Sequence, residues 1–280
     1  MTQAVPRVLY VSTRPAWPLG AGYAVRAHGL ALGCAAAGRC DLIYVSPSDE
    51  ARVLPPDLEG EVAMTVVPVA RRSAAATLWH WVVRGRPWAW ARIDWAAAAP
   101  VVARRITDGG YDGVLVSGVD GWGTVAPEVR DRVVLDFDDV ESKKIGHRLA
   151  NAAVTYSGWA GRLNRWRDRV DLGRWERIER QAVATARGVV VCSDTDRRSF
   201  ASDKVHSVPN TYPSDVAEVV HVPRAERSPV LSFVGSLTTP PNREAARFLV
   251  ESIMPAVWER DPSVTLRLVG RPAADVAAFD

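Results

Sequence analysis

Short apolar runs rich in valine recur along this chain, and segments long enough to form helices separate them. Such runs are typical of strands buried on both faces, and helical crossovers between them produce a parallel sheet. The alternation therefore predicts an α/β fold with a doubly wound, Rossmann-like sheet. The expected strands are Val8 to Ser12, Leu42 to Ser46, Val62 to Val67, Gly113 to Val116, Val133 to Phe137, Gly188 to Cys192 and Lys204 to Val208.

Three segments between these strands have the composition of helices. They are rich in alanine or leucine, and the first of them ends at a glycine. We expect them to be crossover helices on the faces of the sheet. The segments are Tyr23 to Ala37, Ala96 to Ile106 and Arg174 to Ala186.

A polar stretch with three prolines, Pro213 to Pro229, interrupts the pattern and predicts a connection between domains. We expect an N-terminal Rossmann-like domain at residues 1–215, a linker at 216–228 and the start of a second such domain at 229–280.

The second region shows one strand, one helix and another strand. The strand from Pro229 to Gly235 precedes a helix that begins near Asn242, its expected N-cap, and Pro255 should kink or restart that helix. Val264 to Val269 then forms the next strand. One βαβ unit of about 50 residues cannot bury both faces of its own sheet, so this domain is expected to be truncated.

Composition excludes several classes of protein. The chain has 280 residues, with 48% hydrophobic and 24% charged content. Its formal charge of +3 is too small to indicate a nucleic acid or a membrane as a partner. Its three cysteines form no C-x-x-C pair, which argues against a disulfide framework or a zinc site. A signal peptide and a spanning segment are both missing from the sequence, which predicts a cytoplasmic protein.

A glycine-rich loop precedes the first expected helix. Gly20 and Gly22 offer part of a dinucleotide fingerprint, but they lie eight residues or more beyond the strand end at Ser12, and no acidic residue ends the second strand. Both facts argue against a nicotinamide-dependent oxidoreductase. Backbone N–H groups at a helix N-terminus still favour an anion such as a diphosphate. The other interpretation is a simple turn that caps the helix.

Four carboxylates lie within six residues at the carboxyl end of the fifth expected strand: Asp136, Asp138, Asp139 and Glu141. They repel one another unless water, substrate hydroxyls or the following lysines, Lys143 and Lys144, compensate. Because ligands bind at the carboxyl edge of open α/β sheets, Asp138, Glu141 and Lys143 are candidates for catalysis. A solvated helix start paired with lysine is the alternative.

Tryptophan and arginine gather in two regions. Trp79, Trp81, Trp88, Trp90 and Trp95 lie in one, and Trp159, Trp166 and Trp175 in the other, where seven arginines face four acidic residues between Trp159 and Arg180. Such a surface suits membrane headgroups or a lipid-linked acceptor. The alternative is that Trp166 and Trp175 anchor helices in the core or a groove and that the arginines of these helices are solvated. The sequence has no recognised nucleic-acid-binding module, so that class of partner is not expected.

The segment Phe233 to Val250, continuing through Ile253-Met-Pro255 and Leu266 to Gly270, resembles the opening of the donor-binding domain in family 4 glycosyltransferases. Segments upstream are similar in type and order to others of that family. They are Leu135 to Lys144, Trp175 to Glu179, Val189 to Asp194 and Val208 to Asn210.

This resemblance implies the GT-B architecture of two Rossmann-like domains and a retaining transfer of sugar from a nucleoside diphosphate sugar to a hydroxyl acceptor, without a metal or other cofactor. Gly20 and Gly22 would form the N-domain loop, Gly235 and Ser236 the first donor-domain loop with Asn242 beside it, and Asp138 to Lys143 part of the acceptor side.

The sequence departs from the family after Gly270, because the Arg/Lys pair and the Glu-x7-Glu motif that hold the donor are missing. Three hypotheses follow: a transferase that is inactive alone or depends on a partner supplying the missing donor domain, a non-catalytic acceptor-binding scaffold, and an oxidoreductase that binds NAD(P). If the tryptophan–arginine segments contact lipid, the first two would be peripheral proteins at the inner membrane surface.

Overall fold

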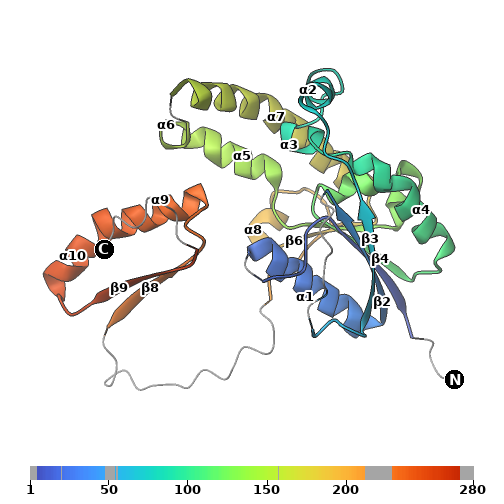
Figure 1. The fold of residues 1–280 in the computed structure, drawn as a ribbon, viewed down its shortest axis with the longest axis horizontal. Coiled ribbons are helices and arrows are strands. Elements are labelled where there is room, and N and C mark those ends of the chain that lie inside the picture. The colour runs from blue at the N-terminus through green and yellow to red at the C-terminus, as the bar shows by residue number, and fades with distance from the viewer. Residues whose placement is uncertain are drawn as a thin grey trace. The chain divides into compact units, whose positions relative to one another are not determined.

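The computed structural model describes residues 5–19, 21–47, 54, 56–156, 158–211 and 229–271. The chain divides into two compact units, Met1–Ser214 and Asp215–Asp280. The first holds the large sheet and its helices, and the second holds a small α/β unit (Figure 1).

The first unit contains a parallel sheet of seven strands in the order β3-β2-β1-β4-β5-β6-β7. This confirms the predicted fold class, and each strand lies within a few residues of its predicted place. The strands are β1 (Arg7–Ser12), β2 (Arg39–Ser46), β3 (Val62–Pro68), β4 (Gly113–Ser117), β5 (Val134–Phe137), β6 (Gly188–Val191) and β7 (Val205–Ser207).

Helices cover both faces of this sheet, as crossovers between parallel strands require. In chain order they are α1 (Gly22–Ala37), α2 (Ala74–Val82), α3 (Trp88–Ala91), the 3₁₀ turn η1 (Trp95–Ala98), α4 (Ala99–Asp108), the 3₁₀ turns η2 (Gly121–Thr124) and η3 (Pro127–Arg132), α5 (Glu141–Ala150), α6 (Ala152–Thr155), α7 (Gly158–Thr185) and α8 (Asp194–Arg197).

Helix α7 is longer than the sequence predicted. The expected helix at Arg174 to Ala186 is the last part of a helix of 28 residues that begins at Gly158. Its first half lacks an apolar stripe, and polar contacts attach it instead: Asp168 accepts hydrogen bonds from Arg148 and Tyr156, and Asp171 accepts them from the indole of Trp81 and the backbone of Trp88.

The strands bury residues on both faces, which explains their uninterrupted apolar sequences. Leu9 and Val11 belong to the cluster that contains Trp122 and Val102. Tyr10, between them, belongs to a smaller cluster with Ala31 of α1.

The second unit is one parallel βαβ unit. Strands β8 (Val230–Val234) and β9 (Thr265–Val269) pair in register, and α9 (Pro240–Phe248), a π-helical turn η5 (Leu249–Ile253) and α10 (Met254–Arg260) join them. Helix α10 starts beside Pro255, so the predicted restart at this proline is confirmed.

One face of this small sheet stays open within the described residues. Both strands alternate exposed and half-buried positions. Val230, Val234 and Val269 are 44%, 75% and 41% exposed. Among the described residues of the unit, Leu237, Ala246 and Met254 are buried.

Candidate functional site

The candidate site of the first unit lies at the carboxyl edge of the sheet. Strands β1 and β4 are neighbours there, but β2 lies on one side of them and β5 on the other, so the chain switches direction between β1 and β4. Ligands of open α/β sheets bind at such switch points. Gly118, with a φ of 78°, turns the chain after β4 and donates its N–H to the carbonyl of Asp136 at 2.9 Å.

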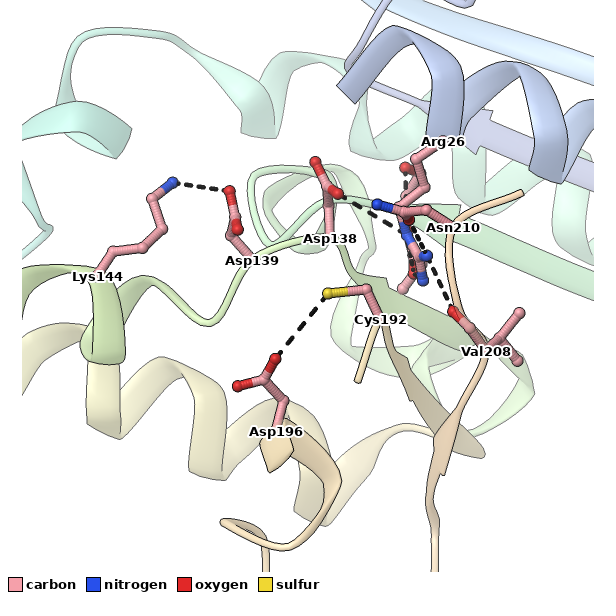
Figure 2. Close-up of polar contacts among 10 residues, drawn as sticks. Arg26, Asp138, Asp139, Lys144, Cys192, Asp196, Val208 and Asn210 are labelled. Atoms are coloured by element: carbon pink, nitrogen blue, oxygen red, sulfur yellow. Dashed lines mark hydrogen bonds and ion pairs between the residues drawn. The ribbon is translucent and has the colours of Figure 1, made fainter. Parts of the chain in front are cut away.

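Arg26 of α1 and Asp136 at the end of β5 form a buried ion pair at this edge. Their side chains are 3% and 0% exposed, and Arg26 Nε lies 3.0 and 3.1 Å from the two carboxylate oxygens of Asp136. Arg26 Nη1 also donates to the carbonyl of Val208 at 3.0 Å and to Asn210 Oδ1 at 2.7 Å (Figure 2). One guanidinium therefore holds α1, β5 and the segment after β7 together.

Asp138 lies beside this ion pair, and its negative charge is less fully balanced by nearby cations than that of Asp136. Its Oδ1 is 3.9 Å from Arg26 Nε, and its side chain is 24% exposed (Figure 2). Burial raises the pKa of Asp138, and the negative charges of Asp139 and Asp136 raise it further. A carboxyl group in this position suits either proton transfer or a hydrogen bond to a substrate hydroxyl.

The other two candidates of the acidic segment have partners. Lys144 Nζ lies 2.8 Å from Glu141 Oε1 and 3.1 Å from Asp139 Oδ2, so one lysine compensates two carboxylates as the sequence suggested. Lys143 pairs instead with Asp196 at 2.7 Å. Asp136 and Asp138 therefore have no lysine partner among the described residues. Asp136 is paired closely with Arg26, whereas Asp138 lies 3.9 Å from Arg26 Nε.

A second ion pair crosses the switch point. Arg14, after β1, lies 2.9 Å from Asp120, after β4. Burial raises the pKa of Asp120, although Arg14 opposes the rise. The guanidinium carbon of Arg14 is also 5.9 Å from the ring centre of Tyr23, in the first turn of α1. The positive charge of Arg14 therefore lies near the start of α1.

Helix α1 begins at Gly22 after Ala21, whose side chain cannot cap it, and its first turn has no acidic residue. Its free N–H groups keep the affinity for an anion on which the sequence prediction depended. A Cβ on Gly22 would meet nothing within 4 Å. Gly20 lies outside the described residues.

In the second unit, Gly235, Ser236 and Asn242 come together. Asn242 Nδ2 donates to the carbonyl of Ser236 at 3.1 Å, and a Cβ on Gly235 would lie 2.8 Å from that nitrogen. The predicted N-cap role of Asn242 is wrong, because α9 begins two residues earlier at Pro240, with Thr239 as its N-cap. Prolines suit the first turn because the N–H they lack has no partner there.

The sequence did not identify three residues of this site: Arg14, Arg26 and Asp120. One feature of the sequence could have indicated the Arg26–Asp136 pair. Arg26 is the lone cation in the first two turns of an apolar helix, and Asp136 is an acidic residue at the end of an apolar strand. Arg14 and Asp120 lie in loops 106 residues apart, and no local pattern connects them.

The tryptophans divide between core and surface. Trp90 and Trp175 stack in the core with ring centres 5.7 Å apart. Trp79, Trp159 and Trp166 are 58%, 75% and 51% exposed. Among the described residues, no helix is long and apolar enough to cross a membrane.

No protein-family model and no curated protein sequence matches the chain. Solved structures do. Phytolacca americana UGT2, solved with UDP-2-fluoro-glucose and pterostilbene, matches with a TM-score of 0.52 and 12% identity, over 95% of this chain and 72% of its own. The chain has the fold of the GT-B glycosyltransferases.

Two further structures match more loosely. Medicago truncatula UGT71G1, solved with UDP-glucose, has a TM-score of 0.47 and 10% identity, over 98% of this chain and 73% of its own. The apo lipopolysaccharide outer core galactosyltransferase WaaB has a TM-score of 0.47 and 10% identity, over 97% of this chain and 70% of its own.

Proposed function

We propose that this chain takes part in transferring a sugar from a nucleoside diphosphate sugar to a hydroxyl acceptor. The observation that carries the proposal is the position of Asp138. It lies at the carboxyl edge of a GT-B type sheet beside the buried cation Arg26 and lacks a lysine of its own. The related UGT2 was solved with a sugar nucleotide analogue and a phenolic compound, which supports this substrate class.

Each group of residues has a proposed task. The start of α1, with Gly20 and Gly22, meets the diphosphate, because free N–H groups stabilise negative charge. Gly235 and Ser236, with Asn242 holding their loop, form the first donor-side turn. Asp138 orients the acceptor hydroxyl or takes its proton, while Glu141 and Lys143 are proposed for the acceptor side. Positioning and stabilisation of the leaving diphosphate lower the barrier of such a transfer.

The motif order that resembles family 4 supports retention of configuration and chemistry without a metal. It also supports residues 1–215 as the acceptor-side domain, 216–228 as a linker and 229–280 as part of the donor domain. The open face of β8 and β9 favours a partner that completes this domain. The second candidate function is a non-catalytic acceptor-binding scaffold.

Calorimetric titration of UDP-glucose, UDP-galactose and GDP-mannose tests donor binding, and sugar transfer to phenolic and lipid hydroxyls tests catalysis. We expect at least one donor to bind, and transfer to fall at least tenfold in D138N. Asp203, an exposed carboxylate with no described partner, supplies the matched control D203N. If donor and acceptor bind but no sugar moves, the scaffold is favoured. Failure of every donor to bind, alone or with a completed second domain, would contradict the proposal.

A further inference from the structure

A second cavity lies in the first unit, apart from the carboxyl-edge site. Its volume is about 380 Å³, and the residues lining it include none of Arg14, Arg26, Asp120 and Asp138. Its wall consists of the region after α2, the 3₁₀ turns η1, η2 and η3, and part of α7. Three tryptophans line it: Trp90, Trp95 and Trp122.

Positive charge dominates this cavity. Arg72, Arg84, Arg86 and Arg130 line it together with His80, whereas Glu128 is the one acidic residue in the lining. Arg72 is compensated by Asp94 at 2.6 Å. No ion pair joins Arg86 or Arg130 to any described carboxylate.

Instead, these two arginines lie over the tryptophan rings. The guanidinium carbon of Arg86 is 5.4 Å from the ring centre of Trp90, and that of Arg130 is 4.7 Å from the ring centre of Trp122. Partial burial lowers the pKa of Arg86, as do the charges of Arg84 and Arg72. Burial also lowers the pKa of Arg130, and the charge of Arg86 adds to the effect. The cations are thus close enough to repel one another.

Three buried donors of the same wall have no acceptor among the described residues: Trp95 Nε1, Trp122 Nε1 and Arg130 Nε. The two tryptophans are 3% and 1% exposed. An unsatisfied buried donor costs roughly 1–3 kcal/mol, so a ligand with several acceptor oxygens would remove an existing penalty here.

We propose that this cavity binds the phosphate group of a phosphorylated small molecule. A phosphate dianion offers two charges to Arg86 and Arg130 and has several oxygens for the unpaired donors. The cavity falls within the roughly 300–1,000 Å³ range of small-molecule sites and exceeds what a bare phosphate needs. Its tryptophan walls suit the ring or chain to which the phosphate is attached.

The test uses the full chain at fixed ionic strength, because exposed charges are screened by salt. Inorganic phosphate and glucose 6-phosphate are titrated by calorimetry, with glucose as the neutral comparison. We expect one saturable site, tighter for glucose 6-phosphate than for phosphate, and no heat of binding for glucose. Vesicles of phosphatidylcholine, with and without phosphatidic acid, test a lipid as the source of the phosphate.

Arg86→Met combined with Arg130→Met should weaken phosphate binding at least tenfold. The control is Arg104→Met combined with Arg247→Met, which removes the same charge from side chains that are 85% and 56% exposed. It should change the affinity less than twofold. W122F, which removes a donor but keeps a ring, should also weaken binding.

R86Q alone covers the case in which the double variant does not fold, because the side chain of Arg86 is exposed. The proposal is overturned if no soluble phosphate binds and phosphatidic acid vesicles either do not bind or bind the Arg86→Met and Arg130→Met double variant as well as wild type. It is also overturned if the control variant loses as much affinity as the cavity variants. Sugar nucleotides also carry phosphate, so UDP-glucose is titrated against the Arg86→Met and Arg130→Met double variant as well. UDP-glucose binding that this variant leaves unchanged separates the two proposals.

Discussion

Arg26 and Asp136 are 110 residues apart in the chain, yet their side chains form an ion pair that water does not reach. The same guanidinium donates to Val208 and Asn210, beyond the last strand of the unit. Three parts of the fold that frame the candidate site thus depend on a single cation, which makes the site sensitive to its loss.

Replacing Arg26 with Met should destabilise the first unit by about 3–5 kcal/mol, because it leaves Asp136 buried without a counterion. Thermal unfolding followed by circular dichroism measures this effect. R104M, at a position that is 85% exposed, should leave the transition unchanged. The double variant R26M/D136L should recover much of the loss, and a double variant as unstable as R26M would show that the other contacts of Arg26 dominate.

Asp138→Asn should make the protein more stable at neutral pH. The folded-state pKa of Asp138 is raised by burial and by Asp139 and Asp136, so ionising this carboxyl disfavours the fold. Below the unfolded-state pKa both forms are neutral and the two proteins should melt together. As pH rises from the unfolded-state pKa to the raised folded-state pKa, the melting temperature of D138N should increasingly exceed that of wild type, and above the folded-state pKa the difference should stay constant. A less stable D138N at neutral pH would show that Arg26 outweighs the burial of Asp138.

Gly22→Ala should weaken sugar-nucleotide binding roughly tenfold without lowering the melting temperature, because a phosphate near the helix start requires close approach of the backbone. The protein itself leaves room for the methyl group. Gly33→Ala, in the same helix and equally unobstructed, is the control and should leave affinity unchanged. Equal donor affinity in G22A and wild type would remove the start of α1 from the donor site.

Gly270→Ala should loosen the second unit. The φ of Gly270 is 148°, and an added Cβ would lie 1.9 Å from the carbonyl oxygen of Gly235. Strain of about 1–3 kcal/mol predicts amide exchange in β8 and β9 that is roughly ten- to a hundredfold faster. The strands of the first unit should exchange as in wild type. Unchanged protection of β9 would mean that the loop after it adapts freely.

Trp159→Ala combined with Leu163→Ala should reduce binding to anionic vesicles roughly tenfold, since both side chains are exposed on one face of α7 and arginines accompany them. Cosedimentation measures it. V101A/F248A, which removes exposed apolar groups elsewhere, should bind as wild type does. Vesicle binding that does not depend on Trp159 and Leu163 would contradict the expected membrane contact.

The sheet was predictable from the sequence because each strand carries its own signal. Runs such as Val8 to Ser12 are almost entirely apolar. Strands of a parallel sheet that are buried on both faces have such runs, so each strand can be recognised from its own sequence without knowledge of its neighbours. The acidic segment at the end of β5 was predictable for the same reason, since its position depends only on the strand before it.

Features that depend on distant contacts escaped prediction. The first half of α7 has no apolar periodicity, and its place depends on partners of Asp168 and Asp171 elsewhere in the chain. The sequence around Arg26 does not distinguish it from other helix residues, because its partner Asp136 belongs to the distant strand β5. The arginines around Trp122 come from segments more than 40 residues apart, so their shared cavity has no local signature.

The open face of the β8–β9 sheet also affects how the protein behaves in solution. A sheet of two strands has no interior strand, so within the described residues each strand presents one unpaired edge. Exposed valines on a face with free backbone edges favour adhesion between copies. Light scattering should therefore rise with protein concentration and temperature. Val234→Lys should suppress this rise, because Val234 is more exposed than Val230 and Val269.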